Sequence, residues 1–390
     1  MQELDLANLE VINVVEGEHK IEIEAKRPND RKSCGNCFSF KIIKHGTRKK
    51  RFVDTPMNSK PVVLVLTQQR YRCKACGLIT QEEFDDIMDK NHQMTKRLVS
   101  FIVHGSMSEP FVSVSEQVGV DERTIRTVFL GTVDQRIRDQ NKKVMSKSPQ
   151  WLAVEEVEIT GEMCFVLVNR ETGYVFDVSN RKNLFLSIFD LRQSGFPFVT
   201  CNFNAEAVAS IKKYMSPKTI VMIPHNYIQQ RVHDCLMDVF TRTRTDWTRQ
   251  EVRKYTKVKR LLEENVESLN ETERKLLESW KSLCPANRKA FELKSSVSEI
   301  LNSANREEAR VRIEEWIKDV TEDVKTEFTP MFKAFTDWNE EILLTFDHDI
   351  PNKDGTHLDS VYDWHWPVLK MRKVTSFGAI RGRLVLSQKF

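Results

Sequence analysis

Residues 31–84 contain two cysteine pairs, Ser33-Cys34-Gly35-Asn36-Cys37 and Arg72-Cys73-Lys74-Ala75-Cys76-Gly77, on either side of a run of alternating apolar residues. A Cys-x-x-Cys pair lets two thiolates occupy adjacent corners of a tetrahedron, and two such pairs complete a closed four-sulfur zinc site. The wide spacing between the pairs leaves room for a hairpin, and residues 61–66 are predicted to form one of its strands. A structural Zn²⁺ is therefore expected, with the ligands Cys34, Cys37, Cys73 and Cys76. The alternatives are two independent redox pairs, or four thiols that fill a core.

Basic residues lie between and beside the two cysteine pairs. Residues 45–51 read His-Gly-Thr-Arg-Lys-Lys-Arg, and residues 68–72 read Gln-Gln-Arg-Tyr-Arg. A small rigid fold with concentrated positive charge suits a phosphate backbone, although charge runs are often simply solvated faces. The candidate DNA contacts in this region are His45, Arg48, Lys49, Lys50, Arg51, Arg70 and Arg72.

The composition limits the class of protein. The 390 residues are 40% apolar and 30% charged, which is ordinary for a globular chain that can bury real cores. The net charge is only +4, so any affinity for nucleic acid must come from local patches. Neither a signal peptide nor an apolar run long enough for a bilayer is found, which favours a reducing, cytoplasmic setting and no membrane partner. The four remaining cysteines are expected to be buried thiols: Cys164, Cys201, Cys235 and Cys284.

The segment after the cysteine pairs has the pattern of a helix-turn-helix. A helical period begins near Leu98, a second short helix is predicted over residues 112–118, and Gly119 makes the turn. Asp121 is expected to cap a third helix that begins at Glu122. The outward face of this third helix supplies four candidate DNA contacts: Arg123, Thr124, Arg126 and Thr127. The alternative is a helical packing subdomain with no DNA contact.

Beyond a polar, basic stretch at residues 136–148, interpreted as a linker, the pattern becomes that of an α/β domain. Three strands are predicted first, and helix and strand then alternate, which is the order of an RNase H-like domain. The predicted strands are 151–157, 165–168, 174–178, 198–202 and 219–223, with a helix at 205–214 before the last. From residue 227 to about 344 the chain is rich in Lys, Glu, Arg and Leu with helical apolar spacing, which indicates a long helical insertion.

The predicted fold class is α+β and multidomain, with an N-terminal β-rich zinc module, a helix-turn-helix, and an RNase H-like α/β core interrupted by a long all-helical insertion. The expected domains are a β-hairpin and four-cysteine zinc-binding domain at 1–90, a helix-turn-helix domain and linker at 91–145, the first part of the core at 146–240, the insertion at 241–340, and the C-terminal part of the core at 341–390.

A series of short motifs resembles the zinc-binding region of the ISL-three group of bacterial insertion-sequence transposases. In chain order they are the Cys34–Cys37 pair, Lys44-His45-Gly46, Arg51-Phe52-Val53-Asp54-Thr55-Pro56, Gln69-Arg70-Tyr71-Arg72-Cys73 and Glu82-Glu83-Phe84. The resemblance continues through the helix-turn-helix, a Glu171-Thr172-Gly173 turn and the closing segment. It implies double-stranded DNA as partner, a homo-oligomer, and a bacterial cytoplasm with nucleoid or plasmid association.

The resemblance also implies a catalytic site of three carboxylates that hold two Mg²⁺ ions about 4 Å apart. The three family positions fall on Glu155, Asn202 and Thr356, with Glu156 in place of the Glu that follows the first. Glu155 keeps a charge one methylene further out, whereas Asn202 and Thr356 lose theirs. Three weakened positions predict a degenerate site, in which Mg²⁺ has a role only if the chain is active. Nearby carboxylates at Asp354, Asp359 and Asp363 leave a shifted ligand set open.

Three functions remain open from the sequence. The first is a transposase-derived DNA-binding protein without strand-cleaving activity, serving as a sequence-specific regulator or nucleoprotein component. The second is an active DDE transposase whose metal ligands have shifted, catalysing metal-dependent strand cleavage and transfer. The third is a protein-interaction scaffold that binds protein partners through the helical insertion, with Trp247, Trp280, Trp316 and Trp338 as contacts.

Overall fold

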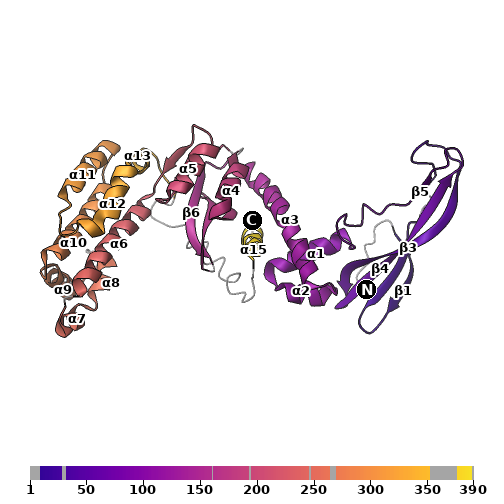
Figure 1. Cartoon of the computed structure of the whole chain (residues 1–390), viewed down its shortest axis with the longest axis horizontal. Coiled ribbons are helices and arrows are strands. Elements are labelled where there is room, and N and C mark those ends of the chain that lie inside the picture. Colours follow the sequence, from indigo (N-terminus) through magenta and orange to yellow (C-terminus); the bar gives the residue numbers. More distant parts are fainter. Residues whose placement is uncertain are drawn as a thin grey trace. The chain divides into compact units, whose positions relative to one another are not determined.

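A computed structural model describes residues 9–28, 32–159, 161–192, 195–245, 247–263, 269–351 and 376–388. These residues form two compact units (Figure 1). Unit 1 contains the described residues up to 140 together with 376–388, and unit 2 contains those from 141 to 351. None of the described helices combines the length and the apolar character that crossing a membrane would require.

Unit 1 begins with a sheet that carries the cysteine pairs. Its strands are β1 (Glu10–Glu16), β2 (Ile21–Lys26), β3 (Ile42–Met57), β4 (Lys60–Cys73) and β5 (Ile79–Gln81). Their order is β1-β2-β4-β3, and β5 pairs with β4. β1 and β2 form an antiparallel hairpin, and β3 and β4 form a long one that contains the strand predicted over residues 61–66 (Figure 1). Ile23, Leu64 and Leu66 are fully buried on one face, where they form a core with Phe84 and Met88.

The helix-turn-helix predicted from the sequence is confirmed. Its helices are α1 (Lys96–Ser108), α2 (Phe111–Val118) and α3 (Glu122–Met145). Gly119 ends α2 in the left-handed conformation at φ 69°, and a Cβ on it would lie 2.9 Å from Pro61. Asp121 caps α3, because its Oδ1 accepts a 2.9 Å hydrogen bond from the Thr124 amide. The turn therefore needs glycine, because the φ angle is positive and because there is no room for a Cβ atom.

Residues 136–148, interpreted as a linker, do contain the boundary between the two units, but most of the segment is helical because α3 continues to Met145. The extension is mostly solvated, so its apolar period is weak, and its residues are mainly long polar ones with good helix propensity. Two contacts hold it in place. Ile137 is buried, and Asn141 Nδ2 donates a 3.0 Å hydrogen bond to the Phe176 carbonyl.

Residues 341–390 were expected to complete the RNase H-like core, and the structure corrects this for the last helix, α15 (Phe377–Leu386). This helix belongs to unit 1, where Gly382 packs so closely on α3 that a Cβ would lie 2.7 Å from Val133 and 3.0 Å from Phe129. Arg383, 2% exposed, donates to the carbonyls of Ser106 (2.8 Å) and Glu109 (2.9 Å) at the end of α1. The orphan carbonyls of that helix end thus receive a charged donor.

Unit 2 is built on a sheet of five strands. These are β6 (Trp151–Ile159), β7 (Glu162–Asn169), β8 (Val175–Asn180), β9 (Phe198–Cys201) and β10 (Ile220–Met222). Their order is β10-β9-β6-β7-β8, with β6, β7 and β8 antiparallel and β9 and β10 parallel to β6. Helices α4 (Leu184–Leu191) and α5 (Ala205–Tyr214) cover one face, in a core with Leu152 and Val154. This is the RNase H-like arrangement that the sequence predicted.

The rest of unit 2 is helical, as predicted. The helices are α6 (His225–Arg244), α7 (Arg249–Tyr255), α8 (Val258–Glu263), α9 (Glu271–Lys281), α10 (Pro285–Leu301), α11 (Arg306–Asp319), α12 (Lys325–Asp337) and α13 (Asn339–Leu343). Trp280 and Trp316 are buried in their shared core, and Trp247 and Trp338 pack against it. Trp316 Nε1 also donates to the Leu293 carbonyl at 3.0 Å. These side chains hold the insertion together.

Two glycine substitutions test the docking of α15. Gly382→Ala should destabilise unit 1 by about 1–3 kcal/mol, because the new methyl group overlaps Val133 and Phe129. Gly131→Ala on α3 is the matched control, because nothing lies within 4 Å of its added Cβ and alanine should stabilise the helix by about 0.5–1 kcal/mol. Urea unfolding followed by circular dichroism measures both.

The five tryptophans among the described residues all lie in unit 2, so tryptophan fluorescence should change little in either variant: Trp151, Trp247, Trp280, Trp316 and Trp338. Equal circular-dichroism midpoints for Gly382→Ala and the original chain would contradict the packing of α15 on α3.

Candidate functional site

The two cysteine pairs meet at the end of the β3–β4 hairpin. Their four sulfur atoms all lie within 4.8 Å of one another, with Cys34 Sγ 3.7 Å from Cys76 Sγ and Cys37 Sγ 3.6 Å from Cys73 Sγ. Each pair sits in a tight knuckle closed by a 3.0 Å backbone hydrogen bond, from the Phe38 amide to the Cys34 carbonyl and from Gly77 to Cys73. Four converging sulfur ligands are the donor set of a closed structural zinc site.

The electrostatics of the thiols also fit a cation. The amides of Cys37 and then Asn36 lower the pKa of the Cys34 thiol to about 6, and the Cys76 amide helps to lower that of Cys73. The Ser39 amide acts to lower the pKa of Cys37, but crowding by the other thiols and burial together raise it to about 12. Four thiolates this close repel one another, and a bound Zn²⁺ would remove that repulsion.

The predicted DNA contacts of the zinc module fall into two groups. Lys49 Nζ lies 2.7 Å from Glu24 Oε1, and Arg51 forms an ion pair with Glu22, so β2 neutralises both cations. The remaining members form no ion pair with any described residue, and all but the half-buried Lys50 are exposed: His45, Arg48, Lys50, Arg70 and Arg72. The second group therefore carries the net positive charge of the hairpin.

The predicted contacts on α3 lie at its N-terminal end. Arg123 and Thr127 are exposed, whereas the Thr124 hydroxyl donates to Asp121 Oδ2 at 2.6 Å as part of the helix cap. Arg126 pairs with Glu122 at 2.7 Å and lies over the Phe111 ring. Of the two arginines predicted as contacts on α3, Arg123 is thus the one that is exposed and has no described carboxylate partner.

The first implied catalytic position, Glu155, lies on β6 and is 2% exposed. A buried guanidinium is its neighbour, since Arg170 Nη1 lies 3.9 Å from Glu155 Oε1. Arg170 also donates to the Pro351 carbonyl at 2.8 Å and to Thr200 Oγ1 at 3.3 Å. Sequence reasoning missed Arg170, because its place in an Arg-Glu-Thr-Gly turn after β7 predicts a solvated residue.

The second implied position, Asn202, follows β9 and contacts Glu156 instead of Glu155. Asn202 Nδ2 donates to Glu156 Oε2 at 3.0 Å, and Asn204 Nδ2 lies 3.4 Å from both oxygens of the same carboxylate. Consecutive side chains of a strand point to opposite faces, which separates Glu155 from this amide cluster. The third position, Thr356, lies outside the described residues, as do Asp354, Asp359 and Asp363.

The described donor set does not fit a pair of Mg²⁺ ions. Such ions need several hard anionic oxygens converging on one space. Here the Glu155 carboxylate lies against a guanidinium, and the Glu156 carboxylate accepts hydrogen bonds from two amides. Asn202 Oδ1, a neutral oxygen, is buried without a hydrogen-bond partner among the described residues.

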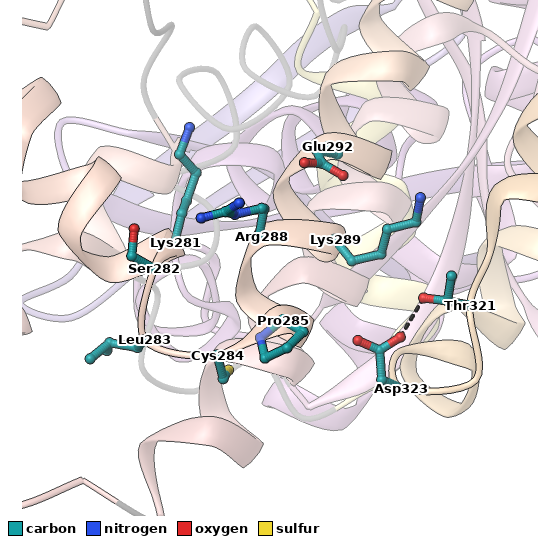
Figure 2. A pocket seen from close by; sticks show the side chains of 10 residues that line it. All are labelled: Lys281, Ser282, Leu283, Cys284, Pro285, Arg288, Lys289, Glu292, Thr321 and Asp323. Atoms are coloured by element: carbon teal, nitrogen blue, oxygen red, sulfur yellow. Dashed lines mark hydrogen bonds between the residues drawn. The ribbon is translucent and has the colours of Figure 1, made fainter.

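A hollow of about 610 Å³ lies in the helical insertion, between the α9–α10 turn and the segment before α12 (Figure 2). Its cations are largely engaged with carboxylates: Lys289 Nζ lies 2.6 Å from Asp319, and Lys281 is paired with Glu278. Asp323 accepts a hydrogen bond from the Thr321 hydroxyl (Figure 2). This hollow brings together no set of groups suited to catalysis.

Replacing one sulfur ligand tests the zinc site. Cys73→Ser should remove the metal, which the original chain is expected to hold at one ion per molecule, and should unfold the knuckles. Cys284→Ser is the control, because this half-buried thiol lies in the insertion, outside the four-sulfur cluster. Elemental analysis of the purified proteins measures the zinc, and a Cys73→Ser protein with full zinc content would refute the assignment.

Three family models match consecutive parts of the chain. The zinc-finger of transposase IS204/IS1001/IS1096/IS1165 matches residues 30–76, and the helix-turn-helix domain of transposase family ISL3 matches residues 82–132. The third model, the DDE domain of the ISL3 family, is described as a transposase and matches residues 162–353. No curated protein matches the chain at a significant level. Since all three models describe one family and follow in order, the chain belongs to the ISL3 family of insertion-sequence transposases, whose zinc-ribbon and helix-turn-helix domains are DNA-binding modules.

Proposed function

We propose that this member of the family binds specific DNA without cleaving it, as a regulator or as a component of a nucleoprotein assembly of several copies. The observation that carries the proposal is the buried pair of Arg170 and Glu155 at the first catalytic position. The guanidinium supplies there the positive charge that a metal ion would otherwise bring to the carboxylate.

The charge of Arg170 is permanent. Burial lowers the pKa of the guanidinium from its usual value while Glu155 acts to raise it, and an arginine of this kind stays protonated in proteins. A divalent cation on Glu155 would lie within a few ångströms of this fixed charge, and their repulsion in a weakly screened interior would be strong. Displacing Arg170 instead would leave a charge buried without a partner, which costs several kcal/mol.

The amide at position 202 supports the same conclusion. Its Nδ2 donates to Glu156, a contact that an aspartate could not make without a proton or a cation between the two carboxylates. The neighbouring Asn204 adds a second amide donor to the same group. Among the described residues, the Glu156 carboxylate therefore accepts hydrogen bonds from two neutral amides.

The parts that would bind DNA are intact. The zinc knuckles, the capped α3 and the unpaired cations of the hairpin combine a positively charged strand surface with a helix-turn-helix. The scaffold alternative loses two of its four proposed contacts, since Trp280 and Trp316 are buried in the core of the insertion.

DNA binding and strand cleavage can be tested on one protein sample. A duplex selected from a random library should be bound with strong salt dependence and should remain uncut in Mg²⁺ or Mn²⁺. Arg123→Ala should weaken binding by about 1–3 kcal/mol and relax selectivity, whereas Lys50→Ala should weaken all duplexes alike and lower the salt slope by about one. Lys333→Ala, an exposed lysine of α12, is the control. If the protein nicks DNA in the presence of metal and Glu155→Gln abolishes the nicking, the proposal that it does not cleave DNA is wrong. If no duplex is bound, the whole proposal is wrong.

A double-mutant cycle tests the cation role of Arg170. Arg170→Met should destabilise unit 2 by about 3–5 kcal/mol, because Glu155 is left buried with its charge. Arg170→Met with Glu155→Gln removes both charges and should recover most of the loss. Urea unfolding followed by tryptophan fluorescence measures the free energy of unfolding of each variant. If millimolar Mg²⁺ raises the stability of the original chain, Arg170 does not act as the internal cation of this site.

A further inference from the structure

The two zinc knuckles are closed by the same backbone hydrogen bond but carry very different residues at the position after the second cysteine. In each, the residue after the second cysteine donates its amide to the carbonyl of the first cysteine at 3.0 Å. In the second knuckle this residue is Gly77, with φ 76°, and in the first it is Phe38, with φ 55°. A left-handed conformation suits glycine, whereas for a bulky residue it is strained by about 1–3 kcal/mol.

The strained position presents an aromatic ring to solvent. Phe38 is 75% exposed and Phe40, two residues on, is 82% exposed, which makes them the most exposed large apolar side chains among the described residues. The backbone that carries them is fixed, because the Cys34 amide donates to the Ser39 carbonyl at 2.9 Å and the Ile42 amide to the Phe40 carbonyl at 2.9 Å. Two exposed rings on a hydrogen-bonded backbone, which stack on no other ring among the described residues, indicate a surface that stacks on something else.

The charged residues near the two rings indicate what kind of molecule the rings contact. Between residues 32 and 81 the only acidic residue is Asp54, which is buried and held by Arg97 and Thr95. Lys41 and Lys74 are exposed neighbours, since the Lys74 amide donates to the Lys41 carbonyl at 2.8 Å. Arg72, also exposed, lies directly between Ile43 and Ile79 in the sheet register. Aromatic rings among cations match a polyanion with flat π faces.

We propose that Phe38 and Phe40 form a stacking platform for unpaired bases of DNA, next to a duplex segment bound by the cations of the hairpin. Base stacking on aromatic side chains is tolerant of sequence, because every base has a π face. Paired bases inside a duplex do not offer such a face, so the platform selects DNA with a frayed or single-stranded end. This inference rests on the proposed DNA binding and specifies which DNA the zinc module prefers.

The two knuckles supply the decisive variant. Phe38→Gly gives the first knuckle the residue that the second already has, so the full-length protein should keep its zinc and be at least as stable. Phe40→Leu keeps an apolar side chain but removes the ring. Phe185→Leu, a partly exposed phenylalanine of α4 in unit 2, is the matched control.

The measurement is the ratio of affinities for one duplex with a single-stranded thymine overhang and the same duplex with blunt ends. The original chain and Phe185→Leu should prefer the overhang, and each of Phe38→Gly and Phe40→Leu should lower that preference by roughly 5- to 150-fold, the range for one stacked base. Neither substitution removes a charge, so the salt dependence should stay the same.

Equal affinity of the original chain for both duplexes would overturn this inference and leave the proposed function standing. Full preference in both Phe38→Gly and Phe40→Leu would also overturn it, and would assign the exposed rings to an apolar contact with a protein. Failure to bind either duplex would remove the proposed function, together with the inference that rests on it.

Discussion

The centre of unit 2 depends on one buried ion pair, between the guanidinium of Arg170 and the carboxylate of Glu155. Arg170 directly follows β7, and Glu155 lies on β6. The same guanidinium also donates to Thr200 on β9 and to the Pro351 carbonyl. Four separate parts of the chain are thus joined through one side chain that is 1% exposed. The carboxylate at the first catalytic position that the family implies thus lies beside a guanidinium that also contacts β9 and Pro351.

Much of the fold could be predicted because its signals are local. The Cys-x-x-Cys spacing, Gly119 in a left-handed turn and Asp121 as a helix cap are each determined by a few neighbouring residues, and all three lie as expected. The succession of strands and helices along unit 2 was predicted from apolar periodicity. Local rules of this kind need no knowledge of distant contacts.

The features that could not be predicted depend on distant contacts. Arg170 lies in a turn sequence, and only the approach of Pro351 and Thr200 makes it a buried cation. The extension of α3 is too polar for its apolar period to be seen. In the sequence Phe38 is only a residue beside a cysteine, and its dihedral angle and exposure distinguish it from Gly77. The candidate DNA contacts could be named from composition, but the neutralisation of Lys49 and Arg51 by β2 could not.

The docking of α15 on the helix-turn-helix has a consequence for synthesis of the protein. Phe129 and Val133 on α3, and the carbonyls of Ser106 and Glu109, are covered by a helix that the ribosome makes only after all of unit 2. A nascent chain therefore carries a helix-turn-helix without this cover until α15 has been synthesised. A message with an early stop codon would yield a protein whose helix-turn-helix lacks this cover, however well its zinc knuckles are formed.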